Sequence, residues 1–253
     1  MFIVAKYTLV EAYKRRFILL FCLTLITSLA VGGYAAGLAV VSKQYTLAAF
    51  YGFCARIAAV TLLAGYIILN ESRALESDRA SLAFGLPIHR AQYLAAKWLA
   101  YLAVALVMAL LAALPLTIMP VSAANLLSWT LSLYCELLIV ISVSLMLSLI
   151  FTQPLLSLLV FGVFYLFARG SGEFARHSGH ILDTHPGGLD TLMAWTVKAA
   201  TLIVPTLGEF APAVLLLHEH PAETAWLPLL TQTLLFTALL LAVSAERLLR
   251  KQF

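Results

Sequence analysis

Two ionisable residues lie in the middle of long apolar stretches of this sequence, where an unpaired charge is unfavourable. Arg56 lies in the apolar run 47–69 and Glu136 in the run 127–150. Each follows about nine residues after its run begins, which is roughly 14 Å along an α-helix. An uncompensated charge at that depth in a bilayer costs roughly 2.5 kcal/mol or more. We therefore expect Arg56 and Glu136 to form an ion pair that faces the interior of a helix bundle. The pair could be a static clamp, or it could line a substrate path and break during transport.

Histidine and carboxylate side chains gather near the start of a later, more polar segment. His177, His180, Asp183 and His185 lie close together in the sequence. Such groups can bind zinc or copper. Their spacing matches no stringent metal motif, and the glycines around them are typical of a solvated loop. We therefore predict no metal site, and these four residues remain weak candidates only.

The composition places most of the chain in lipid. Of 253 residues, 62% are hydrophobic and 11% are charged, and the mean hydropathy is +0.97. A soluble domain carries about 25% charged residues, so this much apolar surface would have no favourable arrangement in water. The formal charge of +4 falls mostly at the ends of the apolar runs. It is a topology signal and does not indicate nucleic-acid binding.

The apolar runs predict an all-α polytopic membrane protein with six spans and a single domain, residues 1–253. The expected spans are 17–41, 47–69, 95–119, 127–150, 154–168 and 224–243, and most of them are near the roughly 20 residues that a bilayer requires. The fifth span is short. The apolar stripe of residues 1–16 predicts an amphipathic helix at the membrane surface, although a frayed start of the first span would give a similar pattern. Within 169–223, the apolar stretches 189–204 and 210–217 predict re-entrant or interfacial helices.

The distribution of lysine and arginine predicts the orientation. With the N-terminus inside, the outer side holds few basic residues, namely Lys43, Arg169, Arg176 and Lys198. The cytoplasmic side holds Lys6, Lys14, Arg15, Arg16, Arg73, Arg79, Arg90, Lys97, Arg247, Arg250 and Lys251. This asymmetry places both termini in the cytoplasm and residues 169–223 outside the cell.

The most informative cytoplasmic stretch is the expected loop 70–94. It is dense in charge, and an apolar stretch at 82–86 ends at Pro87. An apolar centre with charged flanks suits a docking element, in which apolar side chains fill a groove and charges set the register. The alternative is a solvated loop with ordinary positive-inside charges.

This stretch resembles the cytoplasmic loop of the ABC-2 family of transporter permeases. The family pattern has two acidic residues, a Gly-Thr, an apolar stretch, Leu-Pro-x-x-Arg, an aromatic residue and a lysine. The matching residues here are Glu76, Asp78, Leu86, Pro87, Arg90, Tyr93 and Lys97. Ala80-Ser81 replaces the Gly-Thr, which keeps small residues at that point. The motif covers about twenty residues, whereas the similarity in layout covers the whole chain.

The resemblance implies a permease subunit that couples to a separate ATPase, in most relatives for export. The coupling helix would rest in a cleft of the ATPase and would use Glu76, Asp78, Arg79, Leu82, Phe84, Leu86, Pro87 and Arg90. The implied assembly, in a bacterial cytoplasmic membrane, holds two permease copies and two ATPase copies, and some relatives add an extracytoplasmic partner. The chain contains no G-x-x-x-x-G-K-[ST] phosphate loop, so a partner must bind ATP and Mg²⁺. We expect no enzymatic activity and no cofactor in this chain.

Three further interpretations stay open. Gly33 and Gly37 form a small-residue motif that permits close helix approach, so they are a candidate dimer seam, in a homodimer or a heterodimer. The chain could instead anchor a complex that contains no ABC ATPase. A membrane-embedded enzyme would need histidines or paired carboxylates inside the spans, and the sequence places neither there.

Overall fold

A computed structural model describes residues 7–8, 10–11, 16–38, 43–76, 90–151, 153–184, 205–210, 213–216 and 226–250. In these ranges the regular structure is helical throughout, and six helices are long and apolar enough to cross a membrane. The sequence prediction of an all-helical multi-pass membrane protein is confirmed. The long helices are α2 (Phe17–Leu38), α3 (Lys43–Glu76), α5 (Arg90–Ala113), α6 (Ala123–Ile150), α7 (Pro154–Thr184) and α9 (Trp226–Arg250). The short 3₁₀ helices are η1 (Leu114–Ile118), η2 (Leu207–Glu209) and η3 (Ala213–Leu216).

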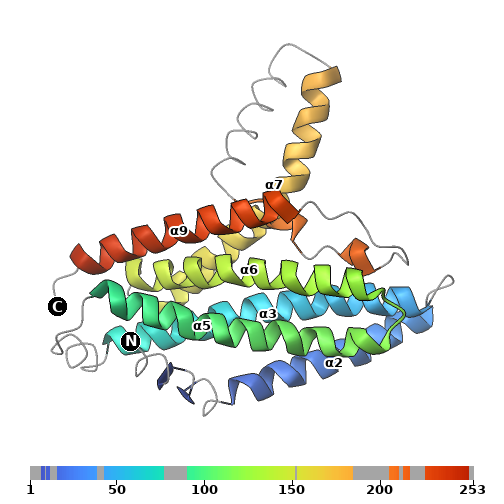
Figure 1. Ribbon diagram of the computed structural model, residues 1–253, viewed down its shortest axis with the longest axis horizontal. Helices are drawn as coiled ribbons and strands as arrows, with labels where there is room; N and C mark the ends of the chain where they lie inside the picture. Colours follow the sequence, from blue (N-terminus) through green and yellow to red (C-terminus); the bar gives the residue numbers. More distant parts are fainter. Residues whose placement is uncertain are drawn as a thin grey trace.

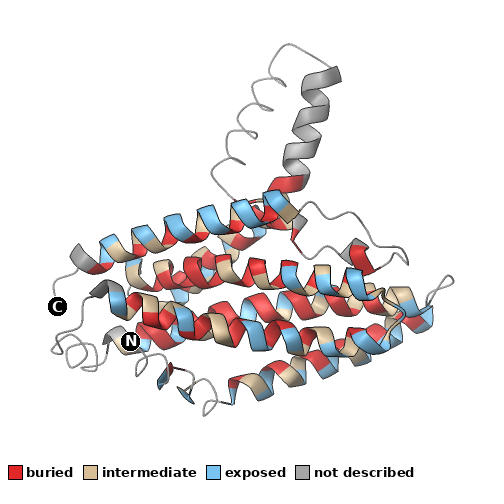
Figure 2. Cartoon of the chain, viewed as in Figure 1, coloured by how far each residue is buried: buried red, intermediate tan, exposed pale blue. Residues whose placement is uncertain are grey.

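Helix α6 is the centre of the bundle (Figure 1). Of its membrane-spanning stretch 72% is buried, against 28% for α2 and for α9. It packs against α3, α5 and α9, and α2 packs mainly on α3. Exposed side chains lie along the outer faces of the peripheral helices (Figure 2). This pattern suits a bundle whose outer surface meets lipid.

The ends of α6 follow from local sequence signals. Ser122 caps its N-terminus, where the hydroxyl oxygen accepts a hydrogen bond from the backbone N–H of Asn125 at 3.3 Å. An N-cap serine satisfies one of the orphan donors of the first turn. The helix ends at Ile150 because Phe151 is extended. Pro154 then begins α7, at the position where proline is best tolerated in a helix.

The helices around the predicted cytoplasmic loop are longer than the apolar runs. Helix α3 continues to Glu76 and α5 begins at Arg90, so regular helix enters the expected loop 70–94 from both sides. The remaining stretch, 77–89, lies outside the described residues. The physical reason is that charged residues at the end of a span do not terminate a helix when they find partners on a neighbouring helix, as Glu71 does below.

The fifth long helix also differs from its prediction. Helix α7 runs to Thr184, and the candidate membrane span within its described part, Pro154–Gly172, includes Arg169, so Arg169 is a helical residue and does not begin a loop. Beyond it, Pro205–Phe210 packs back against α7, and η3 packs on α3 and α6. The apolar stretch 210–217 thus covers the bundle with Phe210, Leu215 and Leu216, all buried. The stretch 189–204 lies outside the described residues.

Two observations concern the N-terminal segment. Residues 7, 8, 10 and 11 are helical, but most of the expected surface helix 1–16 lies outside the described residues. Arg16 has a φ of 55°, a left-handed conformation that an α-helix does not pass through. The backbone therefore turns before α2 begins, which argues against residues 1–16 being a frayed continuation of the first span.

Candidate functional site

The structure brings Arg56 and Glu136 together in the bundle interior. Arg56 Nε on α3 lies 2.6 Å from Glu136 Oε2 on α6. The two side chains are 1% and 0% exposed, so neither charge is compensated by solvent. This is the pairing that the equal depth of the two residues predicted. It joins two helices that pack against each other at the centre of the molecule.

A tyrosine from α7 completes the coordination of the carboxylate. The Tyr165 hydroxyl donates to Glu136 Oε1 at 3.0 Å. Oε1 of Glu136 therefore accepts a hydrogen bond from a neutral donor, while Oε2 contacts a cation in an ion pair. Both contacts lower the cost of burying the carboxylate. Sequence analysis did not single out Tyr165, because a tyrosine within an apolar run carries no charge signal.

The segment Pro205–Phe210, called the return segment below, packs against α7 beside the ion pair. The Leu207 carbonyl, at the start of η2, accepts from Arg56 Nη2 at 2.7 Å and from Arg169 Nη1 at 3.2 Å. One backbone oxygen is thus shared by two guanidinium groups. Thr206 extends the network to α9, where its hydroxyl donates to Gln232 Oε1 at 3.1 Å. The cluster of Arg56, Glu136, Tyr165, Arg169 and the Leu207 carbonyl is called the arginine cluster below.

Gly208 permits the close approach of the return segment to α7. A Cβ at this position would lie 2.8 Å from the carbonyl oxygen of Arg169, a distance that real Cβ atoms do not show. The neighbouring Ser171 hydroxyl lies 3.4 Å from the Pro205 carbonyl. The backbone of η2 therefore sits directly on α7, and this contact is what aims the Leu207 carbonyl at both arginines.

A second buried ion pair, which sequence analysis missed, lies toward the loop-facing ends of α3 and α5. Lys97 Nζ contacts Glu71 Oε2, and the Tyr101 hydroxyl donates to Glu71 Oε1 at 2.5 Å. Asn70 Nδ2 donates to the Tyr101 oxygen at 3.3 Å, and Lys97 Nζ lies 4.9 Å from the centroid of the Tyr93 ring. Asn70, Glu71, Lys97 and Tyr101 are all buried. They form the lysine cluster.

The lysine cluster was missed because its charges resemble ordinary topology signals. Lys97 counts toward the positive-inside set, and Glu71 sits at the edge of a charged stretch. The signal that could have found the pair is the position of Lys97, which falls inside the expected span 95–119. A lysine within a span needs a partner of opposite charge. The cluster also reaches the N-terminal segment, because Asn70 Nδ2 lies 3.5 Å from Glu11 Oε2.

Of the predicted coupling residues, Glu76 ends α3 and Arg90 begins α5. Their side chains, like Asp78, Arg79, Leu82, Phe84, Leu86 and Pro87, lie outside the described residues. Gly33 and Gly37 are exposed on α2, and no other atom lies within 4 Å of a Cβ added at either. Among the described residues, nothing would meet a side chain added at either position, so both glycines stay candidates for a seam.

The candidate metal ligands are not brought into a described site. His177, His180 and Asp183 lie on the α7 backbone, but their side chains and the whole of His185 lie outside the described part of the chain. Within that part, no group of three histidine, cysteine, aspartate or glutamate side chains could hold a metal ion.

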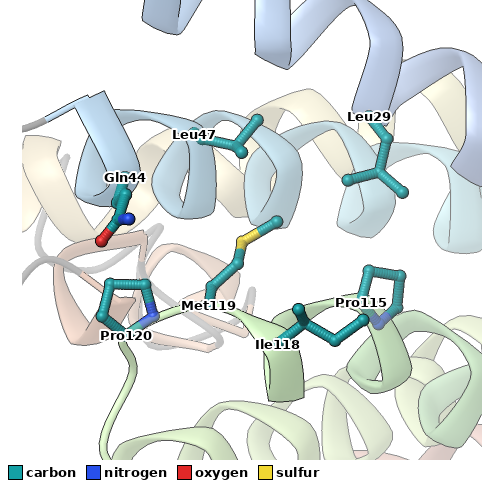
Figure 3. A pocket seen from close by; sticks show the side chains of 7 residues that line it. All are labelled: Leu29, Gln44, Leu47, Pro115, Ile118, Met119 and Pro120. Atoms are coloured by element: carbon teal, nitrogen blue, oxygen red, sulfur yellow. The ribbon is translucent and has the colours of Figure 1, made fainter.

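An apolar cavity of about 300 Å³ opens between α2, α3 and η1 (Figure 3). It lies at the end of the bundle opposite the lysine cluster, and Gln44 supplies its polar side chain. The lining residues are Leu29, Gln44, Leu47, Pro115, Ile118, Met119 and Pro120.

No protein-family model and no curated protein matches this chain. The described residues define a helical multi-pass membrane protein whose interior holds two buried ion-pair clusters, both of which include a residue of α3.

Proposed function

We propose that this protein is the membrane-spanning permease subunit of an ABC-2 type transporter and that a separate ATPase drives it. The observation that carries the proposal is the position of the lysine cluster. Its Glu71–Lys97 pair joins α3 to α5 next to the ends that flank residues 77–89. That segment holds most of the docking motif, from Asp78 to Pro87. Force applied there by a partner would reach both helices as one unit.

Helix α3 supplies a path from that end to the bundle centre. Glu71 and Arg56 lie on the same helix, roughly 22 Å apart along its axis. Arg56 contacts Glu136 on α6 and the Leu207 carbonyl beside α7. A displacement of α3 therefore acts on discrete charged contacts with two other elements, and such contacts can exist in two alternative arrangements. A substrate pathway at the interface of these helices would be gated in this way.

The remaining support comes from the sequence. Leu86, Pro87 and Arg90 keep the spacing of the family motif, and no phosphate-binding loop is present. The protein would then act with two ATPase copies and a second permease copy, with both termini in the cytoplasm of a bacterial cell. Export is the direction that the resemblance favours.

Purification of the tagged protein from its native membrane in a mild detergent tests the proposal. We expect a nucleotide-binding ATPase to co-purify and the preparation to hydrolyse ATP. Leu86→Asp places a charge in the apolar centre of the docking segment and should reduce the retained ATPase at least tenfold. Leu155→Asn, at an exposed site on α7, is the matched control and should retain it. A wild-type preparation without any ATPase would refute the proposal, and another co-purifying complex would support an anchoring role instead.

The side of the membrane is tested separately. Ser81→Cys, introduced after the three native cysteines are replaced, should react with a membrane-impermeant maleimide only in inside-out vesicles. Labelling from the outer face of intact cells would place the docking segment where no cytosolic ATPase can reach it.

A further inference from the structure

The apolar cavity between α2, α3 and η1 has walls that are fixed by contacts outside it. Pro115 has no backbone N–H, and near this proline α5 gives way to the 3₁₀ helix η1. The Ala112 carbonyl just before η1 accepts from the buried Tyr51 hydroxyl of α3 at 3.0 Å. On the other side, α2 comes close to α3 at Gly32, where an added Cβ would lie 3.1 Å from Leu47 Cδ1. The cavity is therefore part of the packed bundle.

The cavity has a polar end and an apolar end (Figure 3). Gln44 and Pro120 lie at one end, beside the start of α3 and the turn that joins η1 to α6. Leu29 and Pro115 lie at the other end, where the lining is apolar. The cavity is lined by residues that the structure describes, and Gln44 supplies the single polar side chain among them. With so few polar partners, ordered water is not a stable occupant.

The cavity opens toward the surface that meets lipid. Ile118 lines it and is also 90% exposed, and the neighbouring Leu114 is 59% exposed. Both residues belong to the candidate membrane span Gln92–Ile118, so the exposed side chains of this region face hydrocarbon. Lys43 is exposed and precedes Gln44, so a cation adjoins the polar end. An apolar interior with a cation at its polar end complements a molecule that has a hydrocarbon chain and an anionic group.

We propose that this cavity binds one hydrocarbon chain of a membrane phospholipid. The chain runs from Gln44 toward Leu29, and the phosphate of the headgroup stays outside, on the side of Lys43. A volume of about 300 Å³ is at the lower end of the range for ligand pockets and suits part of one chain better than a whole lipid. Because the chain leaves a bilayer that is as apolar as the cavity, dispersion contacts with the fixed walls hold it there. The inference goes beyond the proposed transport function and does not require an ATPase.

The test uses the purified full-length protein in vesicles of dioleoylphosphatidylcholine that contain a photoreactive phosphatidylcholine. Its diazirine is placed either at the methyl end of one acyl chain or next to the ester, and mass spectrometry maps the cross-links. We expect the methyl-end probe to label Leu29 and Pro115 at least threefold more than Leu127 and Leu131, which are exposed on α6 at the same end of the bundle. The ester-end probe should shift the labelling toward Gln44. Labelling of the cavity no stronger than that of α6, or the reverse order of the two probes, would overturn the site.

A variant that fills the cavity makes the outcome specific. The Met119 side chain points across the cavity toward Leu47 (Figure 3), so Met119→Trp should reduce the cavity labelling at least threefold and leave that of α6 unchanged. Leu127→Trp adds the same ring on the lipid-facing surface and should leave the cavity labelling unchanged. Equal loss in both variants, or loss in neither, would overturn the site. Where Met119→Trp does not fold, the pattern of the two probes on the wild-type protein decides alone.

A second copy of this chain is the other molecule that could cover the cavity, and the same samples test for it. Absence of enriched labelling in the wild type, together with a smaller cross-linked dimer fraction in Met119→Trp, would assign the cavity to a contact between subunits and overturn the lipid site. An ATPase that co-purifies with a protein whose cavity is not labelled would leave the transport proposal standing alone.

Discussion

Glu136→Gln is the most informative single change in the arginine cluster. It preserves the shape of the side chain and the oxygen that accepts the Tyr165 hydrogen bond, but it removes the negative charge 2.6 Å from Arg56. Removing one partner of a buried pair costs about 3–5 kcal/mol. Insertion measurements give about 2.5–3.5 kcal/mol for an arginine at the centre of a span. Because the Leu207 carbonyl still accepts from Arg56, we expect the lower end, about 3 kcal/mol.

A double variant separates the loss of the pair from the cost of a stranded charge. Arg56→Met with Glu136→Gln removes both charges and keeps a side chain of similar length. Since uncharged replacements of a whole buried pair are often nearly neutral, about 2 kcal/mol of the lost stability should return. The double variant would then be more stable than the sum of the two single losses predicts. The double-mutant cycle would report this difference as a favourable coupling energy between Arg56 and Glu136.

Equilibrium unfolding in mixed micelles, with increasing denaturing detergent, measures these free energies. Glu246→Gln, an exposed carboxylate on α9, is the control and should change the unfolding free energy by less than about 0.5 kcal/mol. If Glu136→Gln is as stable as that control, or if the double variant is less stable than either single variant, then the buried pair does not hold α3 to α6 and the reasoning fails.

Three other changes have clear expected outcomes. Gly208→Ala should separate η2 from α7 and lower the unfolding free energy by about 2 kcal/mol. Gly162→Ala is the control, because there is open space around an added Cβ at this position, and it should be neutral or slightly stabilising. Equal effects of the two changes in unfolding titrations would contradict the close contact. Lys97→Met strands the buried Glu71 carboxylate and should cost about 3 kcal/mol in the same titration; a wild-type midpoint would contradict the lysine cluster. Gly33→Leu should leave the fold unchanged but lower the dimer fraction seen by cross-linking, and an unaltered fraction would place the seam elsewhere.

The arginine cluster was half predictable from the sequence, for a physical reason. Arg56 and Glu136 are isolated charges within apolar runs and lie at equal depth, so the cost of burying each one alone points to the other. Arg169 gave no such signal because it follows the end of an apolar run, where a basic residue is usually a boundary. Its partner is a backbone carbonyl at Leu207, and no residue type marks a carbonyl as an acceptor.

The same distinction explains the fold. The six spans were predictable because five of them have enough apolar residues to cross a bilayer, and the shorter fifth, 154–168, is also a continuous apolar run. The true ends of α3 and α5 were not, since charged residues there read as a loop until Glu71 and Lys97 are seen to face one another. The pairing depends on the angle and register between two helices, and neither is encoded in the composition of one of them.

The shared acceptor at Leu207 has a consequence for how this protein can vary. The two arginines contact the backbone at that point, so another apolar residue of similar size could replace the leucine without breaking their contact. Leu207→Ala would destabilise the protein through the cavity left by this fully buried side chain, and the carbonyl acceptor itself would remain. A one-residue insertion or deletion between 205 and 210, by contrast, would rotate the carbonyl away from both guanidinium groups. The length of this short turn should therefore be far more constrained than its composition.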